Sequence, residues 1–273
     1  MIIQAPAKIN IEFEIIGRRG DGYHEVRTVM QTVDLCDYLT IEKSEQFILS
    51  GTLVAPTEET TMYKSVKIME ETFGQSFPIS VHLDKVIPLM AGLGGGSSDA
   101  AATLYAINEL YELKCSKEEL MGLGASVGAD VPFFIVGGKC LCEGIGEKVT
   151  PLPPDEGKFY YLIFRPHKRI ATKQAYMDYD RVGQSFADAA RVKAPQLDDV
   201  FQFFRDAVVS GKGPSTWVKR DFYEAVHGDQ PVHAIAGGIE SFYSRMVLMT
   251  SPTPIYVPGW DGDIYFTRPV GRR

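Results

Sequence analysis

Residues 88–101 read PLMAGLGGGSSDAA: a cluster of glycines, two serines, an aspartate and the start of an apolar run. A glycine in regular structure costs roughly 0.5–1 kcal/mol relative to alanine, so Gly92, Gly94, Gly95 and Gly96 together require a physical reason. One explanation is a flexible turn. The other is a loop whose backbone must lie very close to a ligand.

The residues on either side of the cluster favour the second explanation. Residues 78–88 contain an alternation of apolar and polar side chains, at Ile79, Val81 and Leu83, which predicts a strand, and residues 98–113 have the apolar periodicity of a helix. Ser97, Ser98 or Asp99 is the expected N-cap of that helix. A strand, a glycine loop and a helix N-terminus together bind phosphate, because backbone N–H groups and the positive end of the helix dipole face the anion.

The spacing of the glycines argues against two common phosphate-binding motifs. A Walker loop requires GxxxxGK[ST], and no lysine follows these glycines. A dinucleotide-binding turn requires GxGxxG with an acidic residue about 20 positions further on, which GLGGGS does not fit. The sequence therefore predicts a phosphate loop of another kind.

The rest of the chain predicts strands first and then alternating helices and strands, which is typical of an α+β fold in two lobes. The expected strands cover 8–16, 27–35, 37–43 and 78–88 in the first half and 159–166 and 262–267 in the second. The expected helices cover 60–74, 98–113 and 116–128, the last opened by a capping box of Ser116 and Glu119, with another starting at Thr172. Residues 129–138 are expected to form a loop that leads into apolar strands. The proline-rich stretch at 151–158 divides an N-terminal lobe, 1–155, from a C-terminal lobe, 156–273.

Composition narrows the class of protein. The 273 residues carry a formal net charge of −7, which argues against wholesale binding of nucleic acid. The N-terminus does not have the pattern of a signal peptide, and no window reaches the ~18 apolar residues that span a bilayer. The four cysteines are Cys36, Cys115, Cys140 and Cys142. Their spacing is not that of metal ligands, which predicts buried or half-buried thiols in a reducing compartment. The expected location is the cytoplasm.

Two charged residues outside the loop are candidates for chemistry. Phosphoryl transfer requires a group that positions or deprotonates the attacking hydroxyl, and cations that offset phosphate charge. Asp130, in GADVPFF, is either a cap or turn residue or a catalytic aspartate. Lys8, at the front of the first strand, is either simply solvated or able to reach a carboxylate or phosphate.

Four stretches together resemble one enzyme family. PAKIN at 6–10, DGYHEVRTVMQTVDL at 21–35, the glycine loop, and GADVPFF with EGIGE at 128–147 are similar to the 4-diphosphocytidyl-2-C-methyl-D-erythritol kinases. These enzymes of the non-mevalonate isoprenoid pathway belong to the galactokinase, homoserine, mevalonate and phosphomevalonate (GHMP) kinase superfamily. The resemblance is strong over residues 5–150 and weaker through 165–176.

The resemblance implies a two-lobed kinase with its active site between the lobes. The implied reaction is the transfer of phosphate from ATP, with Mg²⁺, to the 2-hydroxyl of the cytidine-diphosphate substrate. Lys8 and Asp130 would be catalytic, with Asp130 as the base. Asn10 and His24 would hydrogen-bond the substrate, while Tyr23 and Tyr176 would stack on its cytosine. The implied ATP-binding residues are Pro88, Gly92, Leu93, Gly94, Gly95, Gly96, Ser97, Ser98 and Asp99.

The second half departs from the family pattern from about residue 211 onward. The family's third glycine motif is replaced by LMTSPTPIYV at 248–257, where prolines remove N–H donors, and Arg220 stands in place of an asparagine. Two alternatives therefore stay open beside the active kinase, which would be a monomer or a homodimer. One is a related kinase with another small-molecule acceptor, and the other is a relative that binds nucleotide without turnover.

Overall fold

The computed structural model describes residues 1–52, 56–154, 160–166, 176–177, 180, 232–234 and 262–271. The chain divides into two compact units. The first consists of Met1–Pro154 together with Val270–Arg273, and the second of Asp155–Pro269.

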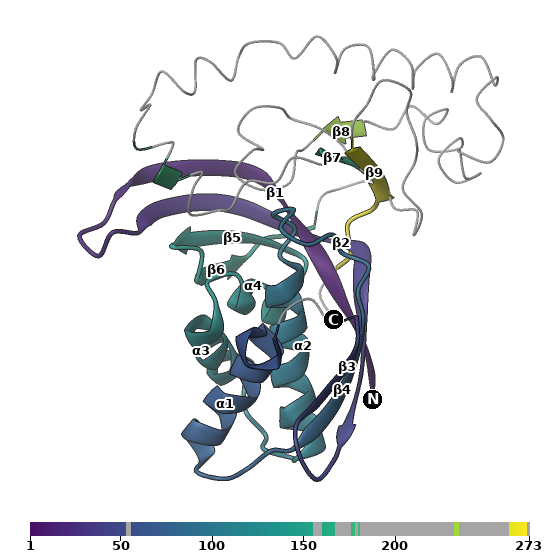
Figure 1. Ribbon diagram of the computed structural model, residues 1–273. Helices are drawn as coiled ribbons and strands as arrows, with labels where there is room; N and C mark the ends of the chain where they lie inside the picture. Colours follow the sequence, from purple (N-terminus) through teal and green to yellow (C-terminus); the bar gives the residue numbers. More distant parts are fainter. Residues whose placement is uncertain are drawn as a thin grey trace, which may run out of the picture. The chain divides into compact units, whose positions relative to one another are not determined.

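The first unit is built on a mixed sheet around one long hairpin, drawn in purple in Figure 1. Strands β1 (Ile2–Arg18) and β2 (His24–Lys43) pair antiparallel along almost their whole length. On its other edge β2 pairs with two strands in turn, first β5 (Lys139–Gly144) and then β4 (Ile79–Asp84). The described strands β3 (Ile48–Gly51) and β6 (Lys148–Pro151) complete this sheet in the order β3-β4-β2-β5-β6.

Helices cover one face of this sheet (Figure 1). They are α1 (Thr61–Phe73), α2 (Gly95–Leu110), α3 (Lys117–Val127) and the short α4 (Val131–Val136), with a 3₁₀ turn, η1 (Thr57–Glu59), before α1. The predicted capping box is confirmed at α3, where Ser116 and Glu119 each bond the other's backbone N–H. The predicted end of α1 is also confirmed, because Gly74 caps it in the left-handed conformation.

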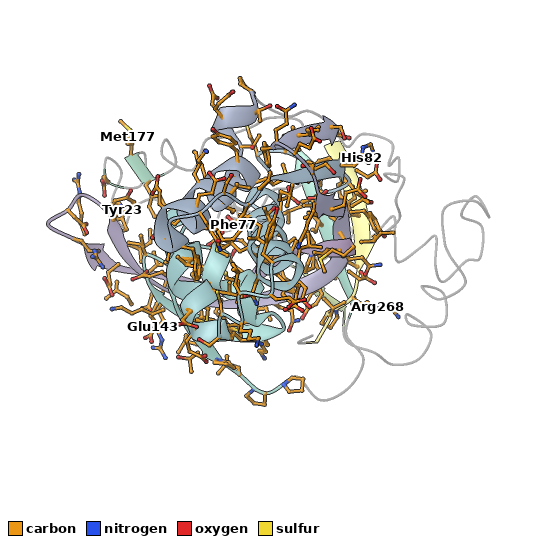
Figure 2. The ribbon with its side chains drawn as sticks, turned by 90° about the horizontal axis from the view of Figure 1, so that it is seen from below. Tyr23, Phe77, His82, Glu143, Met177 and Arg268 are labelled. Atoms are coloured by element: carbon orange, nitrogen blue, oxygen red, sulfur yellow. The ribbon has the colours of Figure 1, made fainter. Side chains whose placement is uncertain are left out.

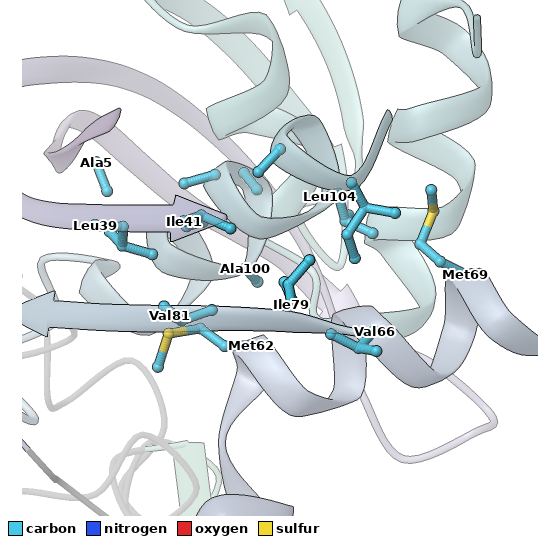
Figure 3. Close-up of a cluster of buried hydrophobic side chains, with 14 of the residues drawn as sticks. Ala5, Leu39, Ile41, Met62, Val66, Met69, Ile79, Val81, Ala100 and Leu104 are labelled. Atoms are coloured by element: carbon cyan, nitrogen blue, oxygen red, sulfur yellow. The ribbon is translucent and has the colours of Figure 1, made fainter. Parts of the chain in front are cut away.

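The core of the first unit lies between the sheet and the helices. Apolar side chains from alternate positions of the strands, including Leu39, Ile41 and Val81, face Met62 and Leu104 of the helices (Figure 3). All five are at most 1% exposed, so the sheet and helices form one close-packed layer pair. This packing gives α2, and the loop before it, a rigid support.

Three local predictions are wrong. Residues 27–35 and 37–43 form one strand, because two extra residues, Asp34 and Leu35, are taken up by a bulge opposite Pro6 and Ala7 rather than by a turn. Helix α2 begins earlier than predicted: its N-cap is Gly94, so Ser97, Ser98 and Asp99 all lie inside the first turns. Residues 131–136 form helix α4 rather than a loop before a strand, because Pro132 suits the first turn of a helix.

The described part of the second unit is a small sheet. Strand β7 (Tyr160–Pro166) pairs parallel with β8 (Val232–Ala234) and antiparallel with β9 (Gly262–Thr267). The predicted strands at 159–166 and 262–267 are thus confirmed. The expectations for Thr172, Arg220 and 248–257 fall on residues outside the described ranges.

Two further expectations concern the cysteines and membrane-spanning helices. Cys36, Cys140 and Cys142 are buried and Cys115 is half-buried, as predicted for the four thiols. Among the helices that the structure describes, none combines the length and apolarity needed to cross a bilayer.

Candidate active site

The glycine loop connects β4 to α2 through unusual backbone conformations. Met90, Gly92 and Gly94 have φ angles of 54°, 69° and 69°, a region that side chains disfavour. Gly94 caps α2 without any side-chain hydrogen bond, and its carbonyl accepts the N–H of Ser98 at 2.9 Å. No N-cap side chain therefore takes up the first N–H groups of α2, and such groups can bind an anion. Pro88 and Leu93 lie in the same loop, Leu93 fully buried.

The protein itself, and not only a ligand, requires two of these glycines. A Cβ on Gly94 would lie 2.7 Å from Phe134 Cζ, and a Cβ on Gly95 would lie 2.9 Å from Lys85 Nζ. A Cβ on Gly96 would meet only Thr61, at 3.6 Å, and Gly96 is exposed. Packing of the protein itself thus accounts for Gly94 and Gly95 but not for Gly96.

Lys8 lies next to this loop. Its backbone N–H donates to the carbonyl of Leu93 at 2.9 Å, which ties β1 to the loop. Its side chain is only 8% exposed, and its Nζ lies 2.6 Å from Asn10 Oδ1 and 3.9 Å from Asp130 Oδ2. Lys8 is therefore a buried cation beside a carboxylate, not a solvated strand residue.

Asp130 occupies the N-cap position of α4 but does not cap it. Its side chain makes no hydrogen bond to the helix and is 31% exposed. Neighbouring glycines keep the surroundings open: a Cβ on Gly146 would lie 3.6 Å from Asp130 Oδ1, and a Cβ on Gly128 would lie 3.8 Å from Ser97 Oγ. The structure therefore does not use this carboxylate for the capping role that the sequence left open, and it brings Asp130, Lys8 and the glycine loop together within one unit.

A buried charge cluster lies under the start of α2. Lys85 Nζ donates to Asp37 Oδ2 at 2.5 Å and to Asp99 Oδ2 at 2.7 Å. Burial, reinforced by the charge of Asp37 and opposed by Lys85, raises the pKa of Asp99 to about 7. Burial lowers the pKa of Lys85, but the two carboxylates outweigh it and the net direction is upward. Within the described residues, Ser98 Oγ and Asp99 Oδ1 are the buried side-chain oxygens without a hydrogen-bond partner.

The predicted substrate residues do not all lie in this unit. Tyr23 is 62% exposed at the tip of the β1–β2 hairpin, well away from Phe77 in the core (Figure 2). His24 and Asn10 are both buried, at 8% exposure. Tyr176 is half-buried and belongs to the second unit.

Sequence reasoning missed the residues that support the site. Asp37 carried a usable signal, because a charged residue within an apolar strand such as DLCDYL is seldom buried without a partner. Lys85, just after a strand, carried none. Thr28 carried none, since a threonine in a strand is ordinary. Its hydroxyl accepts from Asn10 Nδ2 at 2.7 Å and donates to the carbonyl of Glu12 at 2.6 Å.

Similarity to known sequences supports this geometry. Residues 60–138 match the GHMP kinases N terminal domain. The 4-diphosphocytidyl-2-C-methyl-D-erythritol kinase of Caldicellulosiruptor saccharolyticus is 45% identical over 184 residues, which cover 66% of this chain and 63% of that protein. The enzyme of the same name from Carboxydothermus hydrogenoformans is 45% identical over 181 residues, 65% of this chain and 62% of its own length. The matched part thus spans less than two thirds of these relatives.

Similarity to solved structures extends further along the chain. A crystal structure of 4-(cytidine 5'-diphospho)-2C-methyl-D-erythritol kinase superposes with a TM-score of 0.64 at 26% identity and covers 99% of this chain and 100% of its own. Homoserine kinase from Cytophaga hutchinsonii shares the fold, with a TM-score of 0.51 at 23% identity over 70% of this chain and 65% of its own. By sequence match over residues 60–138 and by fold, the chain is similar to the GHMP kinases.

Proposed function

We propose that this protein is an ATP-dependent small-molecule kinase that phosphorylates the 2-hydroxyl of 4-diphosphocytidyl-2-C-methyl-D-erythritol. The proposal depends on one observation: the buried Lys8 lies beside the carboxylate of Asp130, which does not cap its helix, and beside a glycine loop at a helix N-terminus. The relatives named for this reaction support the choice of acceptor.

Asp130 and Lys8 act on the acceptor hydroxyl. Asp130 accepts the hydroxyl proton, and Lys8, 3.9 Å from Asp130 Oδ2, holds the hydroxyl and the carboxylate in position. The hydroxyl oxygen forms a bond to the γ-phosphorus while the bond from that phosphorus to the bridging oxygen breaks, so ADP leaves. Most of the rate enhancement then comes from positioning and charge stabilisation rather than from covalent chemistry by the protein.

The glycine loop holds the phosphates. Gly96 and Ser97 present backbone N–H groups at the open start of α2, and the buried hydroxyl of Ser98, which has no partner among the described residues, is available to a phosphate oxygen. The remaining predicted loop residues, from Pro88 to Gly95 with Asp99, shape this site. Mg²⁺ would enter with the ATP held by this loop and would supply neutralisation of phosphate charge.

The cytidine end of the substrate is assigned to the hairpin. Tyr23 offers an exposed ring for stacking on cytosine, and Tyr176 of the second unit is proposed as a second stacking residue. The buried His24 next to Tyr23 supplies hydrogen bonding, which a flat ring cannot provide.

The test is release of ADP by the purified protein supplied with Mg-ATP and the cytidine-diphosphate substrate, compared with Asp130→Asn. Loss of a positioned base costs about 10²–10⁴-fold in turnover, while Mg-ATP binding is unchanged. Asp84→Asn, which changes an exposed carboxylate on β4, is the matched control and keeps full turnover. Wild-type protein that binds Mg-ATP but releases no ADP identifies the relative without turnover, and ADP release with a different acceptor identifies the related kinase.

A further inference from the structure

A single lysine joins the two ends of the glycine loop. On the strand side, Asp37 of β2 accepts the N–H groups of Val86 and Ile87 at 2.7 and 2.8 Å, which fixes the chain as it enters the loop. On the helix side, Asp99 lies in the first turns of α2. Lys85 Nζ bridges both carboxylates, at 2.5 and 2.7 Å, so the loop is closed by one ion-paired cluster.

The cluster lies against the loop backbone. Lys85 Nζ occupies the space, 2.9 Å away, that a Cβ on Gly95 would need, and Asp37 Oδ2 lies 3.3 Å from the same point. The side chains of Lys85, Asp37 and Asp99 are 6%, 0% and 3% exposed. Since all three side chains are buried, they can affect a bound ligand only by changing the conformation of the loop next to them.

Stability alone does not account for this arrangement. Burying ionised groups costs several kcal/mol each, and well-packed apolar side chains of similar volume stabilise a fold as well or better. The cluster also places two carboxylates against one ammonium directly beside a loop assigned to an anion. Ion pairs at hydrogen-bond distance fix the relative positions of Lys85, Asp37 and Asp99, whereas an apolar contact would not.

We propose that Lys85 is a positioning residue for nucleotide: by bridging Asp37 and Asp99 it holds residues 88–98 in the conformation that receives the ATP phosphates. The inference rests on the proposed function for the identity of the ligand, but the held conformation of the loop is measurable without it. Lys85 contacts neither ATP nor the acceptor in this role.

The main test is Lys85→Met, which keeps the length of the side chain and removes its charge. We expect the KM for Mg-ATP to rise about tenfold, kcat to change much less, and amide hydrogen exchange to accelerate within residues 88–98. Lys67→Met is the matched control, because Lys67 also forms a 2.7 Å ion pair, with Glu70, but on α1 at the surface. A folded Lys85→Met protein with the wild-type KM and wild-type exchange in the loop overturns the proposal.

A second variant separates positioning from folding. Lys85→Met leaves two buried carboxylates without a counter-ion, so it is expected to lower the melting temperature. The triple variant Lys85→Met, Asp37→Asn, Asp99→Asn has no charge in the cluster and is expected to recover thermal stability while the KM for Mg-ATP stays raised. Recovery of both stability and KM by this variant contradicts a positioning role.

Failure of the proposed function gives a different pattern. If the wild-type protein binds Mg-ATP but does not phosphorylate the cytidine-diphosphate substrate, the proposed reaction is wrong, either because the acceptor differs or because the protein has no turnover. In both cases Lys85→Met must still weaken Mg-ATP binding by calorimetry. If the wild-type protein does not bind Mg-ATP, the ligand is wrong, and exchange within residues 88–98 alone decides whether Lys85 holds the loop. Equal exchange in wild-type and variant proteins overturns the inference in either case.

Discussion

The amide oxygen of Asn10 lies 2.6 Å from the ammonium nitrogen of Lys8. The orientation of the amide follows from chemistry, because an ammonium only donates and so faces the oxygen. The amide nitrogen then donates to Thr28, whose own hydroxyl proton is used on the carbonyl of Glu12. A directional chain of hydrogen bonds therefore runs from the backbone of β1 to the lysine beside Asp130.

Thr28→Val breaks this chain without changing the shape of the side chain. Asn10 loses the acceptor for its amide and Lys8 loses a fixed partner, so we expect kcat to fall roughly tenfold, the cost of one buried hydrogen bond. Thr32→Val is the matched control, because Thr32 lies in the same strand, is equally buried and bonds Gly138 and Val270 instead. Equal losses of kcat in the two variants would show that only general stability has been measured.

Two neighbouring glycines are predicted to respond differently to the same change. In Gly95→Ala the new methyl group meets Lys85 Nζ at 2.9 Å, and the ion-paired cluster must shift, so the melting temperature falls. In Gly96→Ala the methyl group meets Thr61 only at 3.6 Å, and alanine favours a helix, so the melting temperature is unchanged or rises. The KM for Mg-ATP rises in Gly96→Ala, because the methyl group covers the phosphate side. Thermal melting of both variants checks the first part, and a stable Gly95→Ala protein contradicts it.

Local signals in the sequence were sufficient for much of the first unit. Ser116 with Glu119 and Gly74 marked helix ends through backbone hydrogen bonding that depends on a few adjacent residues. The proximity of Lys8 to Asp130 was expected through the family resemblance, and the structure has the two 3.9 Å apart.

Contacts between distant parts of the chain were not predictable from those signals. Lys85 and Asp37 are 48 residues apart, and the backbone N–H of Val270 donates to Thr32 at 2.9 Å across the whole length of the chain. Such pairs depend on which strands become neighbours, and no local pattern encodes that. The start of α2 was misplaced for a related reason: capping preferences favour Ser97 or Asp99, whereas tertiary contacts hold the backbone at Gly94.

The raised pKa of Asp99 predicts a pH dependence of stability. Its pKa is about 7 in the folded protein against an ordinary value of 3.8, because burial disfavours the ionised form. Between about pH 4 and pH 7, Asp99 is therefore protonated in the native state but ionised in the unfolded chain. The stability that this bound proton contributes falls as the pH rises through that window.

Thermal melting of wild-type and Asp99→Asn proteins at pH 5 and pH 8 checks this dependence. An asparagine does not titrate, so wild-type stability relative to the variant is expected to decrease toward pH 8, by of the order of 5 °C in melting temperature. Glu71→Gln, which changes an exposed carboxylate on α1, serves as the control and leaves the pH dependence unchanged. A constant difference between wild-type and Asp99→Asn at the two pH values contradicts the prediction.

Tyr23→Ala is predicted to affect only the acceptor. Because 62% of the tyrosine is exposed at the hairpin tip, removing its ring costs little stability, but it removes one stacking surface worth about 1–3 kcal/mol per base. The KM for the cytidine-diphosphate substrate therefore rises roughly tenfold, while the KM for Mg-ATP stays the same. Tyr105→Ala, which removes an exposed ring from α2, is the matched control and leaves both constants unchanged. Steady-state kinetics with each substrate varied in turn distinguish the outcomes. An unchanged KM for the acceptor in Tyr23→Ala would show that the hairpin does not bind the cytosine.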